Sequence, residues 1–143
     1  MIHLFAYGTL MCEDIMHEVA GCSVRSVSAV LDGYCRLRVR DETYPGLIRR
    51  AGAAVEGVLY RDIPKSAWKR LDRFEGAMYV RQSLRVRTED GALVPADTYV
   101  VRPRDRHRLV AADWDFDEFL AGGKDRFRAG YRGYRAIQSR DNP

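Results

Sequence analysis

Residues 62–87 read DIPKSAWKRLDRFEGAMYVRQSLRVR, and the spacing of their apolar residues changes partway along the segment. In the first half, apolar residues recur at helical spacing, namely Ala67, Leu71 and Phe74, with Trp68 beside them. Pro64 suits the first helical position and Gly76 is a natural helix stop. In the second half, Leu84 and Val86 alternate with arginines, as in a half-buried strand. The segment therefore predicts a helix and a strand within one domain.

Strand patterns dominate the rest of the first hundred residues. Apolar runs occur at residues 3–7, 24–31, 34–39, 55–60 and 96–101. Asp32-Gly33, between two of these runs, is a two-residue hairpin signal, and Tyr44-Pro45-Gly46 and Glu89-Asp90-Gly91 are predicted turns. Five or six strands joined by short turns predict an α+β fold, in which a small, mostly antiparallel sheet curls toward a barrel with a few helices packed on it.

Further helices are expected at residues 11–20 and 115–120, the second ended by Gly122-Gly123. Asp115 is suited to cap that helix. The residues expected to pack inward from it are Phe116, Phe119 and Leu120. The highly charged segment 102–108 is predicted to be a loop.

Composition is that of an ordinary globular protein, with 143 residues, 46% hydrophobic and 31% charged. Residues 1–137 are expected to form one domain and residues 138–143 a frayed tail. No run of eighteen apolar residues occurs, so no membrane span is expected. Three cysteines without a CxxC motif favour a reducing, cytoplasmic compartment over a disulfide framework.

The four residues Tyr7-Gly8-Thr9-Leu10 follow directly after the first predicted strand. A glycine at this point allows the backbone to approach a ligand closely, and successive N–H groups at a strand end can bind a carboxylate. An ordinary strand-to-helix turn explains the same residues, so spacing alone leaves both interpretations open.

Glu75 ends the predicted middle helix, beside the apolar Phe74. A carboxylate there faces the negative end of the helix dipole and an apolar surface, and both effects raise its pKa. A raised pKa suits a carboxyl group to general-base catalysis near neutral pH. A solvated surface glutamate is the alternative, and Asp72 is interpreted as solvated. Tyr79 either lines a pocket or belongs to the core or the sheet edge.

Several short motifs follow one another in a characteristic order over residues 1–101. They are Phe5-Ala6-Tyr7-Gly8-Thr9-Leu10, Tyr44-Pro45-Gly46-Leu47, Gly57-Val58-Leu59-Tyr60, Leu71-Asp72-Arg73-Phe74-Glu75-Gly76 with Tyr79 and Arg81, and residues 96–100. Together they resemble the gamma-glutamylcyclotransferase-like superfamily, which includes the gamma-glutamylamine cyclotransferases. The segment from Arg102 onward matches poorly, and no family residue is transferred to it.

The resemblance implies a small mixed β-barrel with helices packed outside. It implies that the loop Tyr7–Leu10 holds the α-carboxylate of a glutamyl group with backbone amides, and that Glu75 is the catalytic glutamate. The implied reaction is an intramolecular aminolysis, in which the α-amine of a gamma-glutamyl group attacks its own side-chain carbonyl. The products are 5-oxoproline and a free amine. The expected substrate is a small gamma-glutamyl amine or amino acid, and no metal or organic cofactor is needed.

Other chemical signals in the sequence are weaker. Asp113-Trp114-Asp115-Phe116-Asp117 opens like a calcium loop, but Glu118 and Lys124 occupy the positions that require glycine and glutamate. The histidines and cysteines lack zinc-site spacing. Basic clusters at residues 102–108 and 124–128 lack a recognised nucleic-acid motif. We therefore expect no metal site and no nucleic-acid partner.

Two alternatives to a cyclotransferase with a small substrate stay open. One is a non-catalytic module that binds a small anion on the same fold. The other is a cyclotransferase that acts on a carrier-bound gamma-glutamyl substrate, which a wide, basic pocket mouth would favour. The leaving amine and the oligomeric state are not indicated by the sequence.

Overall fold

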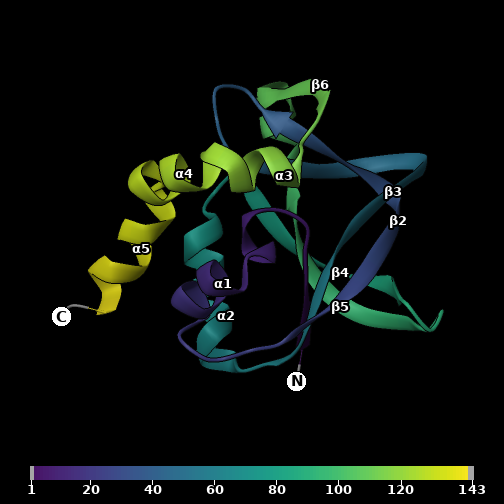
Figure 1. The fold of residues 1–143 in the computed structure, drawn as a ribbon, viewed down its shortest axis with the longest axis horizontal. Helices are drawn as coiled ribbons and strands as arrows, with labels where there is room; N and C mark the ends of the chain where they lie inside the picture. The colour runs from purple at the N-terminus through teal and green to yellow at the C-terminus, as the bar shows by residue number, and fades with distance from the viewer. Residues whose placement is uncertain (1, 142–143) are drawn as a thin grey trace.

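The computed structural model describes the backbone of residues 2–141 and the side chains of residues 2–138. The strands are β1 (Ile2–Ala6), β2 (Ser26–Val39), β3 (Pro45–Ile63), β4 (Tyr79–Thr88), β5 (Leu93–Val101) and β6 (Leu109–Asp113). The helical segments are η1 (Thr9–Met11), α1 (Glu13–Ala20), α2 (Lys65–Glu75), η2 (Pro103–Arg108), α3 (Phe116–Glu118), η3 (Phe119–Gly123), α4 (Lys124–Gly130) and α5 (Arg132–Asp141). In Figure 1 the strands form a barrel and most of the helices lie on one side of it.

Five of the strands close into a ring. Their order is β3-β1-β5-β4-β2, and β2 pairs again with β3, while β6 extends the sheet beside β2. β1 and β5 run parallel, and the other paired strands are antiparallel. The predicted α+β fold, a small mixed and mostly antiparallel β-barrel with a few packed helices, is therefore confirmed. Closure pairs the strand edges that an open sheet would expose.

The pairing of β2 with β3 corrects the predicted hairpin at Asp32-Gly33. β2 runs through these residues without reversing, and its register against β3 shifts only between Asp32 and Tyr34. Gly33 has a φ of 83°, which a glycine tolerates at such an irregularity. Pro45, expected in a turn, pairs with Arg38 at the start of β3. Pairing along two long strands therefore overrides the local Asp-Gly signal.

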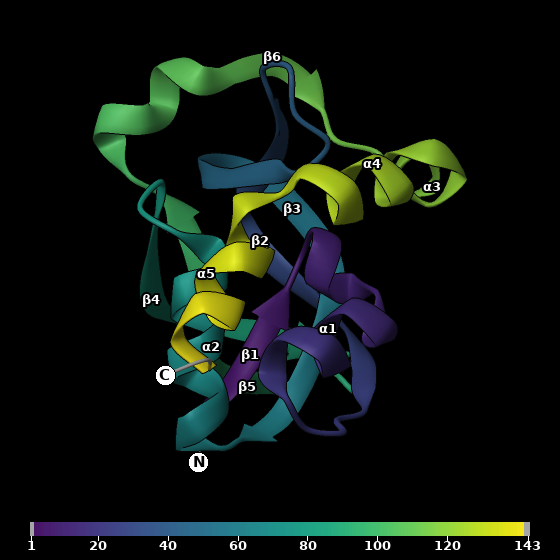
Figure 2. The same ribbon diagram turned by 90° about the vertical axis from the view of Figure 1, so that its left-hand side faces the viewer.

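Helix α2 packs with the apolar face that its spacing predicts, and Figure 2 shows it beside α1 and α5. The buried residues of this face are Ala67, Trp68, Leu71 and Phe74. Pro64 is the N-cap rather than the first helical residue, and Gly76 forms the C-cap with a φ of 82°. Burial of the apolar face holds the helix in one orientation, which determines where its last residue, Glu75, lies.

The C-terminal helices depart from the sequence expectation. Asp115 caps α3 as predicted, because its Oδ1 accepts a hydrogen bond of 3.0 Å from the amide three residues later. Gly122-Gly123 do not end the helix, because the backbone continues through η3 into α4. Leu120 is exposed rather than packed inward. Phe119 and Phe127 pack with ring centroids 5.8 Å apart, and this burial offsets the cost of about 1 kcal/mol for each helical glycine.

Two further expectations were a loop at residues 102–108 and a frayed tail at residues 138–143. Residues 103–108 form the 3-10 helix η2 rather than a loop. Of the tail expected to fray, residues 138–141 continue α5, and residues 142–143 lie outside the described part of the chain. Within residues 2–141, no helix has the length and apolar character needed to cross a membrane.

Candidate active site

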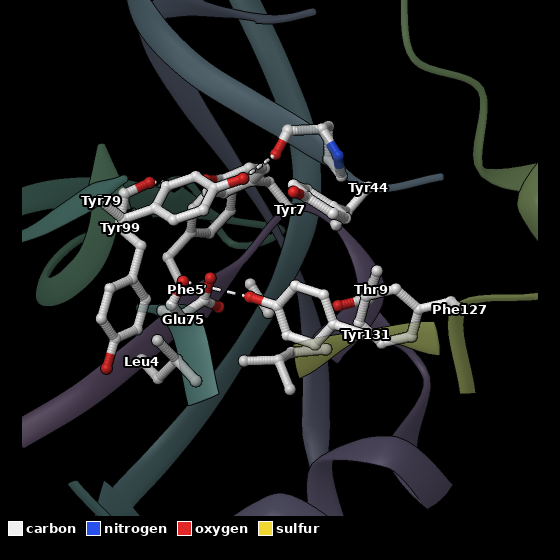
Figure 3. A pocket seen from close by; sticks show the side chains of 14 residues that line it. Leu4, Phe5, Tyr7, Thr9, Tyr44, Glu75, Tyr79, Tyr99, Phe127 and Tyr131 are labelled. Atoms are coloured by element: carbon white, nitrogen blue, oxygen red, sulfur yellow. Dashed lines mark hydrogen bonds between the residues drawn. The ribbon is translucent and has the colours of Figure 1, made fainter. Parts of the chain in front are cut away.

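A narrow pocket lies between the end of α2, the loop after β1 and the C-terminal helices. The sequence candidates that line it are Tyr7, Gly8, Thr9, Leu10, Glu75 and Tyr79, as Figure 3 shows for most of them. Its free volume is about 30 Å³, which is the space of about one water molecule. The fold thus brings together two segments that are more than sixty residues apart in the sequence.

Glu75 is the last residue of α2 and lines the pocket. The residue as a whole is only partly buried, but protein atoms surround its carboxyl group, and this loss of solvation raises its pKa to about 8. Asp72, one turn earlier on the helix, raises the pKa further through its negative charge. The predicted direction is confirmed. Asp72 is exposed, as the sequence interpretation expects, and its charge nevertheless acts on the carboxyl group of Glu75.

The loop between β1 and η1 forms another wall of the pocket. A Cβ atom on Gly8 would lie 2.8 Å from Cγ of Pro45, so the proline ring occupies the space of a side chain. Thr9 and Leu10 are buried, and the Tyr60 hydroxyl donates a hydrogen bond of 2.6 Å to the Leu10 carbonyl. The turn that follows Gly8 is closed by a hydrogen bond of 2.9 Å from the Met11 amide to the Gly8 carbonyl, and Gly8, Thr9 and Leu10 line the pocket.

Five tyrosine side chains line the pocket around the Glu75 carboxyl group: Tyr7, Tyr44, Tyr79, Tyr99 and Tyr131. Tyr79 donates a hydrogen bond of 2.6 Å to the Pro45 carbonyl, and Tyr131 donates one of 3.1 Å to the carbonyl of Glu75 itself. Burial raises the pKa of both phenols, so their hydroxyls stay protonated. The hydroxyls therefore fix the surrounding backbone, while the rings reduce the contact of the carboxyl group with water.

A network of polar side chains holds Asp72 in place beside the pocket. The Tyr99 hydroxyl donates a hydrogen bond of 2.7 Å to Oδ1 of Asp72, and Nε of Arg81 lies 3.1 Å from the same oxygen. The Arg81 guanidinium also lies 4.4 Å from the centroid of the Trp68 ring. These contacts keep the negative charge of Asp72 close to Glu75, which sustains the raised pKa.

The C-terminal helices contribute residues that the sequence interpretation did not assign to a site. Phe127 of α4 and Tyr131, directly after α4, line the pocket with their rings stacked 4.5 Å apart. Tyr99 of β5 was missed as well. The four-residue spacing of Phe127 and Tyr131 was the one available signal, and such spacing indicates a helix face rather than a pocket.

The other candidate groups make structural contacts. Each of the three histidines lies within hydrogen-bonding distance of a backbone group: His3, His17 and His107. Two cations of the second basic cluster, Lys124 and Arg128, each pair with Asp14 of α1 at 2.8 Å. In the part of the chain that the structure describes, no group of three or more potential metal ligands gathers.

Comparisons with known proteins agree with this fold. The family model described as "Gamma-glutamyl cyclotransferase, AIG2-like" matches residues 4–116. AIG2-like protein C of Arabidopsis thaliana is 30% identical over 125 residues, which cover 87% of this chain and 72% of that protein. The solution structure of another Arabidopsis thaliana protein aligns with a TM-score of 0.71 at 24% identity, covering 99% of this chain and 85% of that one. A solved structure named gamma-glutamyl cyclotransferase aligns with a TM-score of 0.63 at 22% identity, covering 71% of this chain and 66% of that one.

The two structural likenesses, at identities below 25%, concern the fold alone. The family match extends over most of the chain and includes Tyr7–Leu10 and Glu75, both of which line the pocket. The chain therefore belongs to the AIG2-like gamma-glutamyl cyclotransferase family.

Proposed function

We propose that the protein is a gamma-glutamyl cyclotransferase that releases 5-oxoproline and a free amine from a small gamma-glutamyl amine or amino acid. Glu75 acts as the general acid and base. The observation that carries the proposal is a carboxyl group of pKa about 8 in the same pocket as the Tyr7–Leu10 loop. Family membership supports the reaction class, and one structural relative bears the name of this activity.

The substrate supplies its own nucleophile in this reaction. Its α-amine attacks the side-chain carbonyl carbon, a carbon–nitrogen bond closes the five-membered ring, and the bond from that carbon to the leaving nitrogen breaks. Two protons pass from the α-ammonium group to the leaving nitrogen, which departs as an ammonium ion. Glu75 accepts each proton and returns it, and a pKa near 8 keeps both directions of transfer accessible near neutral pH.

The Tyr7–Leu10 loop is proposed to position the substrate by binding its α-carboxylate with backbone N–H groups. Holding the amine against the carbonyl makes the attack intramolecular and oriented, an advantage of up to about 7–11 kcal/mol in well-aligned cases. Tyr79 contributes its ring to the pocket wall, because its hydroxyl is already bound to the Pro45 carbonyl. Different segments of the chain thus bind the substrate and transfer the protons.

The test is incubation of the protein with a panel of gamma-glutamyl amines and amino acids, with release of 5-oxoproline measured by mass spectrometry. Glu75→Gln should abolish turnover while the fold is retained, and Glu89→Gln in an exposed turn is the matched control. Turnover retained by the Glu75→Gln variant would contradict the role of Glu75. Binding of these compounds without any 5-oxoproline would instead support a small-anion binding module.

A cyclotransferase with a carrier-bound substrate is the second candidate. A cleft of about 500 Å³ beside the pocket favours it, because three arginines line the cleft and its volume exceeds that of the pocket. Rates measured with the same gamma-glutamyl group, free and attached to a carrier protein, separate the two candidates.

A further inference from the structure

Arg36 of β2 contacts the loop between β1 and η1 from outside the pocket. Its Nη1 donates a hydrogen bond of 2.7 Å to the Tyr7 carbonyl and one of 3.1 Å to the Glu56 carbonyl of β3. Arg36 is half-buried, and it lines a cleft of about 1070 Å³ that shares no lining residue with the pocket. The guanidinium group therefore binds the backbone of the pocket wall without lining the pocket itself.

The guanidinium group of Arg36 is held in place by a segment far away in the sequence. Its central carbon lies 5.3 Å from the centroid of the Trp114 ring, within the range of a cation–π contact. Trp114 is buried, and its Nε1 donates a hydrogen bond of 2.8 Å to the Thr43 carbonyl. The segment after β6 thus helps to fix the direction from which Arg36 reaches the Tyr7 carbonyl.

This hydrogen bond also orients the next amide of the loop. In a planar trans peptide unit the C=O and N–H bonds point in opposite directions, so the Gly8 N–H points away from Arg36. Gly8 lines the pocket. In the described part of the chain, no backbone hydrogen bond outside the helices and strands has the amide of Gly8, Thr9 or Leu10 as its donor. Donation to the Tyr7 carbonyl polarises the peptide unit and strengthens its N–H as a donor.

We infer that Arg36 is a positioning residue, which holds the Tyr7–Gly8 peptide so that the Gly8 N–H binds the α-carboxylate of the substrate. This inference deepens the proposed function and rests on it. The positive charge of the guanidinium group, on the other side of this peptide, adds a longer-range attraction for the carboxylate. Arginine suits the position because it stays protonated at every pH at which the protein is folded.

The test compares two compounds that differ only in the group that the loop is proposed to bind. They are gamma-glutamylethylamide and its analogue in which a neutral α-carboxamide replaces the α-carboxylate. Arg36→Met removes the guanidinium group and keeps an unbranched side chain. We expect kcat/KM to fall about tenfold or more for gamma-glutamylethylamide, and less than about twofold for the α-carboxamide. The loss should fall mainly on KM, because the loop binds the carboxylate before as well as during the reaction.

Arg38→Met is the matched control. Arg38 lies two residues further along β2, and its Nε donates a hydrogen bond of 3.1 Å to the Asp113 carbonyl, outside the pocket. The control loses a contact of the same kind, from a guanidinium group to the backbone, and should keep the native kcat and KM for both compounds. Urea unfolding measures the structural cost in each variant. An equal loss of kcat/KM for the two compounds in Arg36→Met would overturn the inference, because a purely structural role does not distinguish the α-carboxylate.

Arg36→Lys carries the test where Arg36→Met does not fold. Lysine keeps the positive charge and donor hydrogens, but it lacks the planar fork that reaches two carbonyls at once. We expect KM for gamma-glutamylethylamide to rise about threefold, and KM for the α-carboxamide to stay as in the native protein. A change that is equal for the two compounds, or no change for either, contradicts the inference.

Binding without turnover separates this inference from the proposed function. Nuclear magnetic resonance titration of the Glu75→Gln variant follows the Gly8 amide resonance while no product forms. Gamma-glutamylethylamide should shift this resonance, and adding Arg36→Met should raise its Kd about tenfold, with little effect on the α-carboxamide. This result supports the inference even where the native protein releases no 5-oxoproline. Equal affinity for the two compounds, a Kd that Arg36→Met leaves unchanged, or no measurable binding overturns it even where turnover is observed.

Discussion

Substitution of Glu75 by glutamine probes the raised pKa of this residue through stability alone, without any substrate. The pKa of Glu75 is about 8 in the fold, against an ordinary value of 4.5. A native-state pKa above the unfolded value means that the native state holds the proton more tightly. The free energy of unfolding therefore falls as pH rises from 4.5 to about 8, and glutamine lacks this titration.

The size of the effect follows from the two pKa values. A tenfold change in proton affinity corresponds to about 1.4 kcal/mol, so the rise from 4.5 to about 8 corresponds to roughly 5 kcal/mol at high pH. Glu75 keeps part of its surface in solvent, and screening reduces this value. We therefore expect Glu75→Gln to be more stable than the native protein by about 2–4 kcal/mol above about pH 8. Below pH 4.5 the two proteins should be nearly equal in stability.

The assay is urea unfolding of the native protein, Glu75→Gln and Glu89→Gln at about pH 5, 7 and 9. Glu89 lies in an exposed turn, so its variant should follow the native protein at every pH. Parallel stability curves for the native protein and Glu75→Gln would refute the reasoning. Glu75 would then titrate as an ordinary surface carboxylate, and its suitability as a base near neutral pH would be lost.

Two other substitutions test the surroundings of Glu75. Asp72→Asn removes the charge that helps to raise the pKa of Glu75, so the acidic limb of the pH profile of kcat/KM should move to lower pH; an unmoved limb would show that Asp72 does not act on the base. Gly8→Ala places a Cβ atom 2.8 Å from Cγ of Pro45, so we expect urea unfolding to show a loss of about 1–3 kcal/mol. Gly122→Ala, where no atom lies within 4 Å of the new methyl group, is its control and should gain up to about 1 kcal/mol from helix propensity; a Gly8→Ala variant as stable as the native protein would contradict the tight contact at Pro45.

Local sequence patterns predicted the structure correctly where the residues of a single helix or strand determine its conformation. The apolar face of α2 and its end at Gly76 were predicted, because helical spacing and a glycine cap act within a few turns of chain. The same kind of signal failed at Asp32-Gly33 and at Gly122-Gly123. At the first, pairing of β2 with β3 stabilises a continuous strand, and at the second, aromatic packing stabilises a continuous helical path.

Candidate residues were found to the extent that they lie in short motifs. Glu75 and the Tyr7–Leu10 loop were singled out in this way, and so was a raised pKa for Glu75. Phe127 and Tyr131 were not, because an aromatic residue on a helix gives no indication of which cavity it lines. Their segment also lies beyond residues 4–116, the part of the chain that the family model matches.

Hydrophobic spacing was thus sufficient for the fold class and the middle helix, whereas the candidate residues were singled out by the resemblance of short motifs to a known family. Closure of the barrel and docking of the C-terminal helices were needed to bring Glu75, the Tyr7–Leu10 loop and the tyrosines around one pocket. The same packing buries the carboxyl group of Glu75 and places Asp72 near it, and both effects raise the pKa of Glu75. It also brings three arginines together around the cleft beside the pocket. Electrostatic interaction and loss of solvation depend on distances in space, and for residues far apart in the chain no local pattern specifies those distances.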